Sequence, residues 1–285
     1  DSVQPDLVMA TDPDSDRIAV AIPENGGYRK FSGNEMGCLL LQYILDGLKK
    51  AGKLPAHPVA VKSVVSTPLA DRIAAAYGCE MRTVLTGFKY IGGVILELEE
   101  AGRADDFVLG FEESCGYLKG DYARDKDAVV AAMLIAEMAA SYKLEGKTLA
   151  DVMDGLYAAY GHFATGLQNV QFTSDAQKEH CMALMEQLRK QPPAQIAGFP
   201  VTAVTDFRAG FETVLASGEQ QPTGLPKENM VLLTLGEHGR VILRPSGTEP
   251  KIKFYYGIKG TSLEDADAKS EALGKALMSE VDKLL

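Results

Sequence analysis

Three aspartates at alternate positions are the first residues in this chain that could do chemistry. Asp12, Asp14 and Asp16 stand in the run ATDPDSDRIAV (residues 10–20), between two apolar segments. Side chains two residues apart in an extended chain point to the same side, so we expect the three carboxylates to converge. Such a group needs a cation, and an all-oxygen site with few protein ligands suits Mg²⁺. The alternative is a solvated acidic turn.

An EF-hand calcium loop also begins with alternating aspartates, but this run does not match one. An EF-hand needs glycine at its sixth position and glutamate at its twelfth, where this chain has Arg17 and Pro23. Arg17 directly follows the carboxylates. It either neutralises them or reaches an anion bound to the metal, and the two roles are compatible.

A cationic turn, RPSGTEPKIKF, is the second candidate and covers residues 244–254. Arg244 and Lys251 enclose a tight turn in which converging donors and fixed positive charges have the chemistry of a phosphate site. The donors are the hydroxyls of Ser246 and Thr248 and the backbone N–H groups freed by Gly247. The alternative is an ordinary hairpin with charged flanks.

Glu112 and Ser114 follow the apolar strand DFVLGF and form the third candidate. Because they are two residues apart, they can share one face and hydrogen-bond the hydroxyls of a sugar. Two adjacent glutamates are, however, also typical of a solvated loop.

Two further loops carry polar residues next to predicted helices. Thr86, Gly87 and Lys89 lie in TGFK, between a strand and a helix. Lys126 directly precedes another predicted helix, where its charge opposes the helix dipole, so a functional reason for the lysine is favoured.

The elements that position these loops alternate between strands and helices up to about residue 162. Strands at residues 6–11 and 17–23 flank the acidic loop. Beyond them the pattern predicts helices over 32–52, 67–78, 91–102, 126–142 and 148–161, and strands over 59–66, 80–86 and 106–111. Such alternation indicates a layered α/β domain with a mainly parallel mixed sheet, which binds ligands at the carboxyl ends of its strands.

The remaining residues follow a different pattern. A helix near residues 175–190, strands at 230–235, 240–245 and 251–258, and an amphipathic helix over 262–285 are predicted. These elements indicate an α+β domain with an antiparallel sheet and helices on one face.

Composition restricts the class of partner. The 29 basic and 39 acidic residues give a net charge of −10 without a long basic run, which argues against nucleic acid and anionic membranes as partners. No signal peptide or membrane-spanning apolar run is seen. Four scattered cysteines predict free thiols in a reducing cytoplasm. An anionic ligand would therefore need a local cationic pocket.

Five ordered motifs, DPDSDR, TGFK, FEES, RDKDA and RPSGTEPK, resemble those of the α-D-phosphohexomutase superfamily of phosphoglucomutases and phosphomannomutases. The run FEESCGYLKGDYARDKDAV looks closest to the phosphoglucomutase/phosphopentomutase branch. The resemblance extends from about residue 5 to residue 257. It implies an isomerase of carbohydrate metabolism, an intramolecular phosphotransferase acting between the 1- and 6-positions, or 1- and 5-positions, of a glucose, mannose or pentose phosphate.

The resemblance also implies a role for each candidate residue. At the reacting centre, the resemblance implies Mg²⁺ binding by Asp12, Asp14 and Asp16, contact with the transferring phosphoryl group by Arg17, and charge or proton transfer by Lys89 and Lys126. It implies sugar binding by Thr86, Gly87, Glu112 and Ser114. It implies binding of the non-reacting phosphate by Arg244, Ser246, Gly247 and Thr248.

One departure from the family pattern is plain. Family members have four domains, and a serine of the first carries the phosphate that supplies the fourth metal ligand. No such serine loop occurs here, and we interpret Ser66 in VVSTPL as structural. The chain resembles the end of the metal-binding second domain (residues 1–31), the sugar-binding third domain (32–162) and the phosphate-binding fourth domain (163–285).

We therefore expect a fragment, inactive alone, whose partners are a phosphosugar and the missing N-terminal domains of the same polypeptide. One alternative is a stand-alone sugar-phosphate binding module without turnover. Another is a Mg²⁺-dependent phosphatase, although no D-x-D-x-[TV] nucleophile motif supports it.

Overall fold

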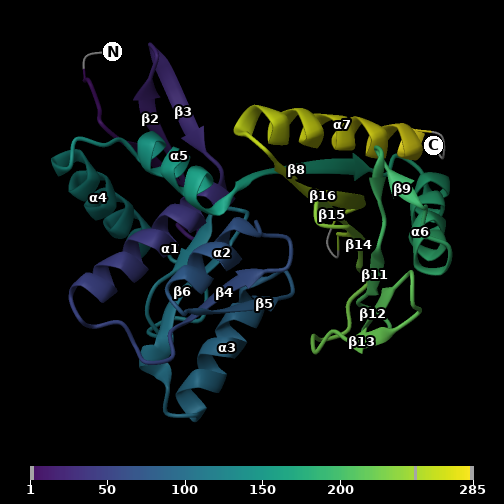
Figure 1. Cartoon of the computed structure of the whole chain (residues 1–285), viewed down its shortest axis with the longest axis horizontal. Coiled ribbons are helices and arrows are strands. Elements are labelled where there is room, and N and C mark those ends of the chain that lie inside the picture. Colours follow the sequence, from purple (N-terminus) through teal and green to yellow (C-terminus); the bar gives the residue numbers. More distant parts are fainter. Residues whose placement is uncertain (1–2, 247–248, 283–285) are drawn as a thin grey trace. The chain divides into compact units, whose positions relative to one another are not determined.

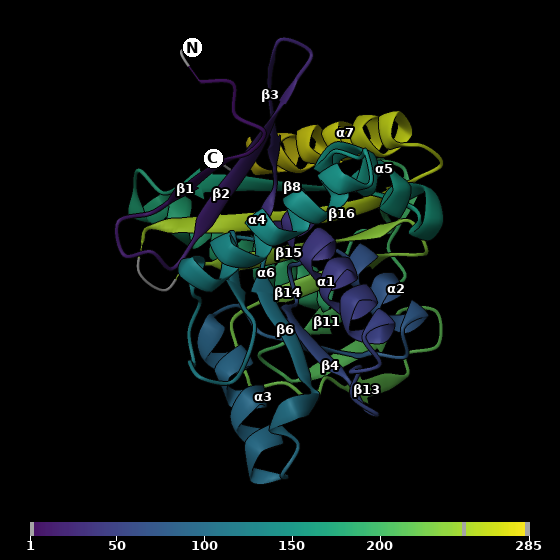
Figure 2. The same cartoon turned by 90° about the vertical axis from the view of Figure 1, so that its left-hand side faces the viewer.

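The acidic loop connects the first two strands of a small antiparallel sheet. The computed structural model describes residues 3–246 and 249–282 (Figure 1). The sheet has the order β1-β2-β3, with β1 (Val8–Thr11), β2 (Ile18–Glu24) and β3 (Gly27–Phe31). The strand β3, which was not predicted from the sequence, pairs with β2 through a tight hairpin (Figure 2). Asn25 and Gly26 both have positive φ, 50° and 78°, as two-residue hairpin turns require.

A second sheet in the same part of the chain has the order β5-β4-β6-β7. Its first three strands are parallel and the last is antiparallel, which confirms the prediction of a mainly parallel mixed sheet. The strands are β4 (Val59–Ser63), β5 (Glu80–Val84), β6 (Phe107–Glu112) and β7 (Gly116–Leu118).

Helices cover both faces of this sheet. Gly110 lies against Ile91 of α3, whereas the next residue, Phe111, lies against Gly37 of α1. Because successive strand residues face opposite sides, α3 and α1 lie on opposite faces. The helices are α1 (Gly33–Lys50), α2 (Leu69–Ala76), α3 (Phe88–Glu100), α4 (Ala128–Leu144) and α5 (Leu149–Tyr160), with a short 3₁₀ turn η1 (Ala104–Asp106).

The sequence predicts Ser32 or Asn34 as the cap of the helix that begins near residue 32, and Thr67 as the cap of the helix over 67–78. Ser32 caps α1 as expected, since its Oγ accepts a hydrogen bond from the N–H of Glu35 and the Glu35 carboxylate accepts one from the N–H of Ser32. The prediction of Thr67 as the cap of α2 is wrong by one residue, because Pro68 occupies the cap position. Thr67 instead bonds α1: its N–H donates to Asn34 Oδ1.

The chain divides into unit 1 (Asp1–Tyr160) and unit 2 (Gly161–Leu285). Unit 2 contains a seven-stranded sheet of order β13-β12-β11-β14-β15-β16-β8, in which every neighbouring pair is antiparallel. The strands are β8 (His162–Gln171), β11 (Ala203–Asp206), β12 (Phe211–Val214), β13 (Gln220–Pro222), β14 (Val231–Leu235), β15 (Gly239–Pro245) and β16 (Lys251–Gly260).

Two helices, α6 (Asp175–Lys190) and α7 (Leu263–Asp282), pack on this sheet beside a small hairpin of β9 (Gln195–Ile196) and β10 (Phe199–Pro200). Met185 of α6 and Leu273 of α7 are fully buried in one core with Val241 and Leu243 of β15. The predicted α+β domain is confirmed. Among the helices of the described residues, none has the length and apolar character needed to cross a membrane.

Candidate functional site

The acidic loop brings its three aspartates together by a turn. The N–H of Ser15 donates to the carbonyl oxygen of Asp12 at 3.0 Å, and Ser15 has a φ of 56°. Asp12 Oδ1 accepts hydrogen bonds from the N–H groups of Asp16 and Arg17 at 3.2 and 3.1 Å. The three carboxylates do converge, but the reason predicted from extended-chain alternation is wrong. The turn held by Asp12 is what gathers them.

The charges in this loop favour a cation. One carboxylate oxygen each from Asp12, Asp14 and Asp16 lies within 4.8 Å of the others. Asp16 Oδ1 is buried and accepts no hydrogen bond within the described part of the chain. Arg17 Nε lies 3.5 Å from that oxygen and 3.9 Å from Asp12 Oδ2, with its side chain half exposed. The donor set therefore fits a hard divalent cation.

Hydrogen bonding also lowers the pKa of Asp12. Desolvation acts to raise this pKa, but hydrogen bonds from the backbone N–H groups of Arg17 and Asp16 and the positive charge of Arg17 outweigh it. The carboxylate that holds the turn is thus kept in its charged form.

Lys126 reaches this loop from the start of α4. Its Nζ donates to Asp16 Oδ2 and to Asp125 Oδ1, both at 2.9 Å. Burial acts to lower the pKa of Lys126, but hydrogen bonds to these two carboxylates raise it further than burial lowers it. Asp127 caps α4, since its side chain accepts hydrogen bonds from the N–H groups of Val129 and Val130. The start of the helix is therefore stabilised by Asp127, and Lys126 is not needed as a cap.

The β6–β7 turn (residues 113–115) is fastened to the acidic loop. The N–H of Ile18 donates to the carbonyl oxygen of Cys115 at 3.1 Å, and Arg17 forms an isolated bridge with Gly116. Cys115 has a φ of 67°, which is unusual for a residue other than glycine. The turn, the acidic loop and Lys126 therefore form one connected group in unit 1.

Glu112 links this group to the TGFK loop. Its carboxylate is buried, and Oε1 accepts a hydrogen bond from the N–H of Gly87 at 2.7 Å. Gly87 has a φ of 119°, and the neighbouring Thr86 hydroxyl is buried without a hydrogen-bond partner in the described residues. Ser114 is exposed. Lys89 is also exposed on α3 with its Nζ over the Tyr90 ring, and no described contact brings it to the acidic loop.

A buried polar network that contacts the β6–β7 turn through Glu113 was not predicted from the sequence. Ser63 Oγ donates to Glu113 Oε2 at 3.0 Å and lies 2.8 Å from Ser66 Oγ. Ser66 is fully buried in this network. Lys62, buried at the end of β4, donates to the carbonyl oxygen of Thr67 at 3.0 Å and also bonds Asp71. A lysine inside the β-branched run VAVKSVV was the available signal.

The cationic turn of unit 2 starts at the end of β15. Arg244 Nε donates to Glu228 Oε1 at 2.6 Å, an acid the sequence analysis did not name. Ser246 Oγ accepts a hydrogen bond from the N–H of Glu249, and the N–H of Ser246 donates to the carbonyl oxygen of Lys251. The other two predicted phosphate ligands, Gly247 and Thr248, lie outside the described residues.

Positive charge is concentrated on one face of the sheet here. Arg244 is directly opposite Lys253 in the β15–β16 ladder, and Lys251 shares the face of Lys253 by strand alternation. Like charges directly opposite each other destabilise a ladder. Glu228, paired with Arg244, and Glu249, paired with Lys251, offset part of this charge, and an anion beside the strands would offset more. The neighbouring Leu243 points to the other face, into the core under α6 and α7.

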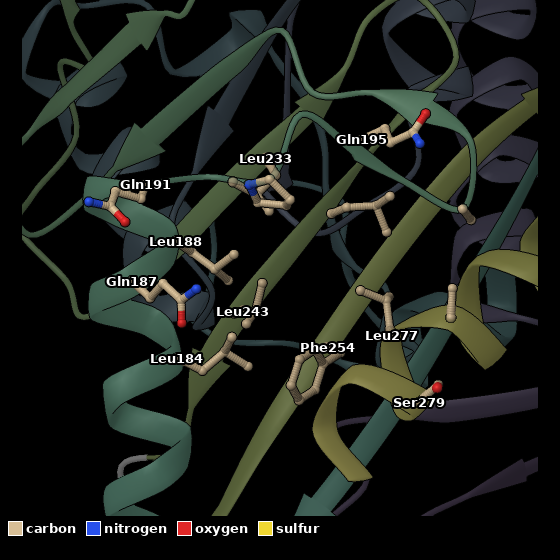
Figure 3. Close-up of a pocket in the computed structure, with 14 residues that line it drawn as sticks. Leu184, Gln187, Leu188, Gln191, Gln195, Leu233, Leu243, Phe254, Leu277 and Ser279 are labelled. Carbon is tan, nitrogen blue, oxygen red and sulfur yellow. The ribbon is translucent and has the colours of Figure 1, made fainter. Parts of the chain in front are cut away.

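A cavity of about 470 Å³ in unit 2 lies on that other face (Figure 3). Leu233, Leu243 and Phe254 line it from the sheet, with Leu188 from α6 and Leu277 from α7. None of the described residues that line it is charged. A phosphate would lose its hydration there without compensation, so this cavity is not the phosphate site.

Comparison with known proteins gives a consistent result. The family model for phosphoglucomutase/phosphomannomutase, alpha/beta/alpha domain III, matches residues 32–160, and the model for the C-terminal domain of the same family matches residues 203–273. A phosphoglucomutase of Staphylococcus haemolyticus is 35% identical over 263 residues, covering 92% of this chain and 46% of that protein. One from Staphylococcus epidermidis is 34% identical over 278 residues, covering 97% and 49%.

Solved structures show the same fold. A putative phosphomannomutase from Thermus thermophilus has a TM-score of 0.61 at 22% identity, over 97% of this chain and 46% of that one. The phosphoglucomutase parafusin from Paramecium has a TM-score of 0.65 at 16% identity, over 98% and 45%. The chain thus spans about half the length of the curated relatives it matches.

Proposed function

The chain belongs to the phosphoglucomutase/phosphomannomutase family, and from that premise we propose that it is the C-terminal part of a phosphosugar mutase. The whole protein would move a phosphoryl group between the 1- and 6-positions, or the 1- and 5-positions, of a sugar. The observation that carries the proposal is the connected group in unit 1, where the hydrogen bond from Ile18 to Cys115 joins the acidic loop to the β6–β7 turn. A transferring phosphoryl group and its sugar need such adjacent sites.

The residues of unit 1 would divide the work. Asp12, Asp14 and Asp16 would hold Mg²⁺, which neutralises charge on a phosphoryl group during transfer. Arg17 would contact that group with its exposed guanidinium. Lys126, already bonded to Asp16, would supply a second positive charge at the reacting centre.

Sugar binding would fall to the neighbouring loops. Ser114 is exposed at the β6–β7 turn, and Glu112 holds Gly87 in the conformation that presents the Thr86 hydroxyl. The hydroxyl of Thr86, which is buried and has no described partner, would bond the sugar only after a local rearrangement that uncovers it. Lys89 would act as a charge partner only after a rearrangement of its exposed side chain.

The rest of the relatives' length would supply what this chain lacks. We propose that the N-terminal domains of the same polypeptide carry the phosphorylated serine, and that residues 1–31, 32–162 and 163–285 are the end of the second domain, the third and the fourth. This chain alone would then bind phosphosugars without turnover. Its four cysteines are free thiols, which suits a cytoplasmic protein.

Titration of this chain with glucose 6-phosphate, followed by NMR, tests the proposal. The amide resonances of Ser114 in unit 1 and of Ser246 in unit 2 are expected to shift, and glucose without phosphate is expected to leave Ser246 unchanged. No conversion to glucose 1-phosphate is expected in the same samples. A chain that shows no sugar-phosphate-dependent shift at either serine would contradict the proposal.

Magnesium binding gives a separate prediction. Calorimetry is expected to show weak Mg²⁺ binding, because the carboxylates that converge within the described residues number three and a metal of this kind usually needs further oxygen ligands. Asp14→Ala removes one ligand and is expected to abolish the heat. Asp105→Ala, which removes an exposed carboxylate on η1, is the control and is expected to change nothing. Equal heats for Asp14→Ala and the unmodified chain would remove the metal assignment.

A further inference from the structure

Glu228 makes the one described hydrogen bond to the guanidinium of Arg244. Glu228 lies just before β14, and its Oε1 accepts from Arg244 Nε at 2.6 Å. The two side chains are 21% and 23% exposed, so the pair is largely shielded from water. The other carboxylate oxygen, Oε2, is buried and has no hydrogen-bond partner in the described part of the chain. Because this carboxylate bonds the Arg244 guanidinium and no other described group, it restricts rotation of that guanidinium.

The backbone around Glu228 is itself held in place. Its N–H donates to the carbonyl oxygen of Phe207, and its own carbonyl oxygen accepts from the N–H of Met230 at 2.8 Å. Phe207 and Met230 are both buried. The backbone that carries this carboxylate is thus fixed just before β14, an interior strand of the sheet, whereas the arginine side chain has several rotatable bonds of its own.

The bonded atom decides what the rest of the guanidinium can do. Glu228 engages Nε, so a phosphate bound by Arg244 would be bound through the two terminal nitrogens, Nη1 and Nη2. Those two nitrogens form a fork that matches two phosphate oxygens. An arginine held at Nε needs no further ordering to present this fork, and such preorganisation strengthens binding.

We propose that Glu228 is a positioning residue that orients Arg244 for the phosphate of the substrate. This inference rests on the proposed function, since that function supplies the phosphate. Glu228 does not touch the phosphate and acts only through Arg244. Its negative charge also offsets part of the repulsion between Arg244 and the facing Lys253 while the site is empty.

Two variants separate positioning from a purely electrostatic effect. Glu228→Gln keeps an oxygen that can accept from Nε but removes the charge, whereas Glu228→Ala removes both. If Glu228 positions Arg244, the alanine variant binds inorganic phosphate and glucose 6-phosphate about three- to tenfold more weakly, and glutamine restores most of the affinity. If Glu228 merely competes with phosphate for the arginine, both variants bind more tightly, which would overturn the proposal.

The Arg244 Nε–Hε resonance provides a readout that a merely structural role would not move. In the unmodified chain it is expected to exchange slowly with water, and Glu228→Ala is expected to make it exchange faster while Glu228→Gln does not. Asp106→Ala is the matched control, since Asp106 accepts a hydrogen bond from Arg103 Nε at 2.7 Å in unit 1, whereas Glu228 and Arg244 belong to unit 2. That variant is expected to lower thermal stability and to leave both phosphate affinity and the Arg244 resonance unchanged.

The outcomes distinguish this inference from the proposed function. Phosphate binding with equal affinity in the unmodified chain and Glu228→Ala overturns the inference and leaves the function standing. If Glu228→Ala binds inorganic phosphate more weakly than the unmodified chain does, the inference is supported. If, in addition, the unmodified chain binds glucose 6-phosphate no more tightly than inorganic phosphate, that result counts against the proposed function. An unmodified chain that binds no phosphate at all overturns the inference.

Discussion

Replacing Gly33 by alanine is expected to destabilise the chain by about 1–3 kcal/mol, the usual cost of forcing an extra methyl group into a packed interior. A Cβ at Gly33 would lie 2.1 Å from the carbonyl oxygen of Glu113 and 2.6 Å from the backbone nitrogen of Cys115. Both are backbone atoms, which cannot rotate away as a side chain can. The β6–β7 turn must therefore move.

The displacement is expected to reach the acidic loop. The carbonyl oxygen of Cys115 accepts the hydrogen bond from the N–H of Ile18, so a shifted turn loosens the first residue of β2. Hydrogen exchange at the Ile18 amide should accelerate, and denaturant unfolding should report the loss of stability. One added methyl group would therefore displace the turn proposed to bind the sugar and disturb the alignment of the three carboxylates.

Gly47→Ala is the matched control, because Gly47 lies in the same helix, α1. A Cβ there meets nothing within 4 Å. Alanine is the better helix former by about 0.8–1 kcal/mol, so this variant is expected to be slightly more stable than the unmodified chain. If Gly33→Ala were as stable as Gly47→Ala, with unchanged exchange at Ile18, the close packing of α1 on the β6–β7 turn would be wrong.

Much of the fold could be predicted because its elements are long and periodic. The alternation that ends near residue 162 gave the parallel sheet, and the helix expected near 175–190 is α6. Most of the strands that were missed are short, and the long exception, β8 with ten residues, is rich in polar side chains. β3 reads GYRKF, with an exposed face and one buried residue, and β11 to β13 have only three or four residues each. Such segments carry too little hydrophobic alternation to be recognised alone.

The candidate site was partly predictable for a different reason. Clustered charges such as those of Asp12, Asp14 and Asp16 are visible in one dimension, but the turn that gathers them depends on the positive φ of Ser15, which its residue type does not indicate. Glu228 could not be found either. It stands 16 residues before Arg244, and only the pairing of β14 with β15 brings the two ends together.

Arg244→Ala is expected to weaken glucose 6-phosphate binding about ten- to a hundredfold, because hydrogen bonds to a charged group contribute about 1.5–3 kcal/mol. Titration by NMR measures the affinity. Arg240→Ala is the control, since Arg240 lies on the same strand and face but opposite Gly257, four residues from the cationic turn. It should bind the sugar phosphate as the unmodified chain does. Equal affinities for all three proteins would mean that this turn is only a hairpin with charged flanks.

The ion pair between Arg244 and Glu228 determines how Arg244→Ala should affect the stability of the fold. A solvated arginine would contribute almost nothing to folding, but Arg244 is paired with Glu228 and its removal leaves a shielded carboxylate without its partner. A modest fall in the melting temperature is therefore expected, and Glu228→Ala in the Arg244→Ala background should recover part of it, because the unpaired carboxylate is then gone. The same double variant should bind glucose 6-phosphate no more weakly than Arg244→Ala alone, since Glu228 acts on the phosphate only through the arginine. A further loss of affinity in the double variant would show that Glu228 contacts the ligand by another route.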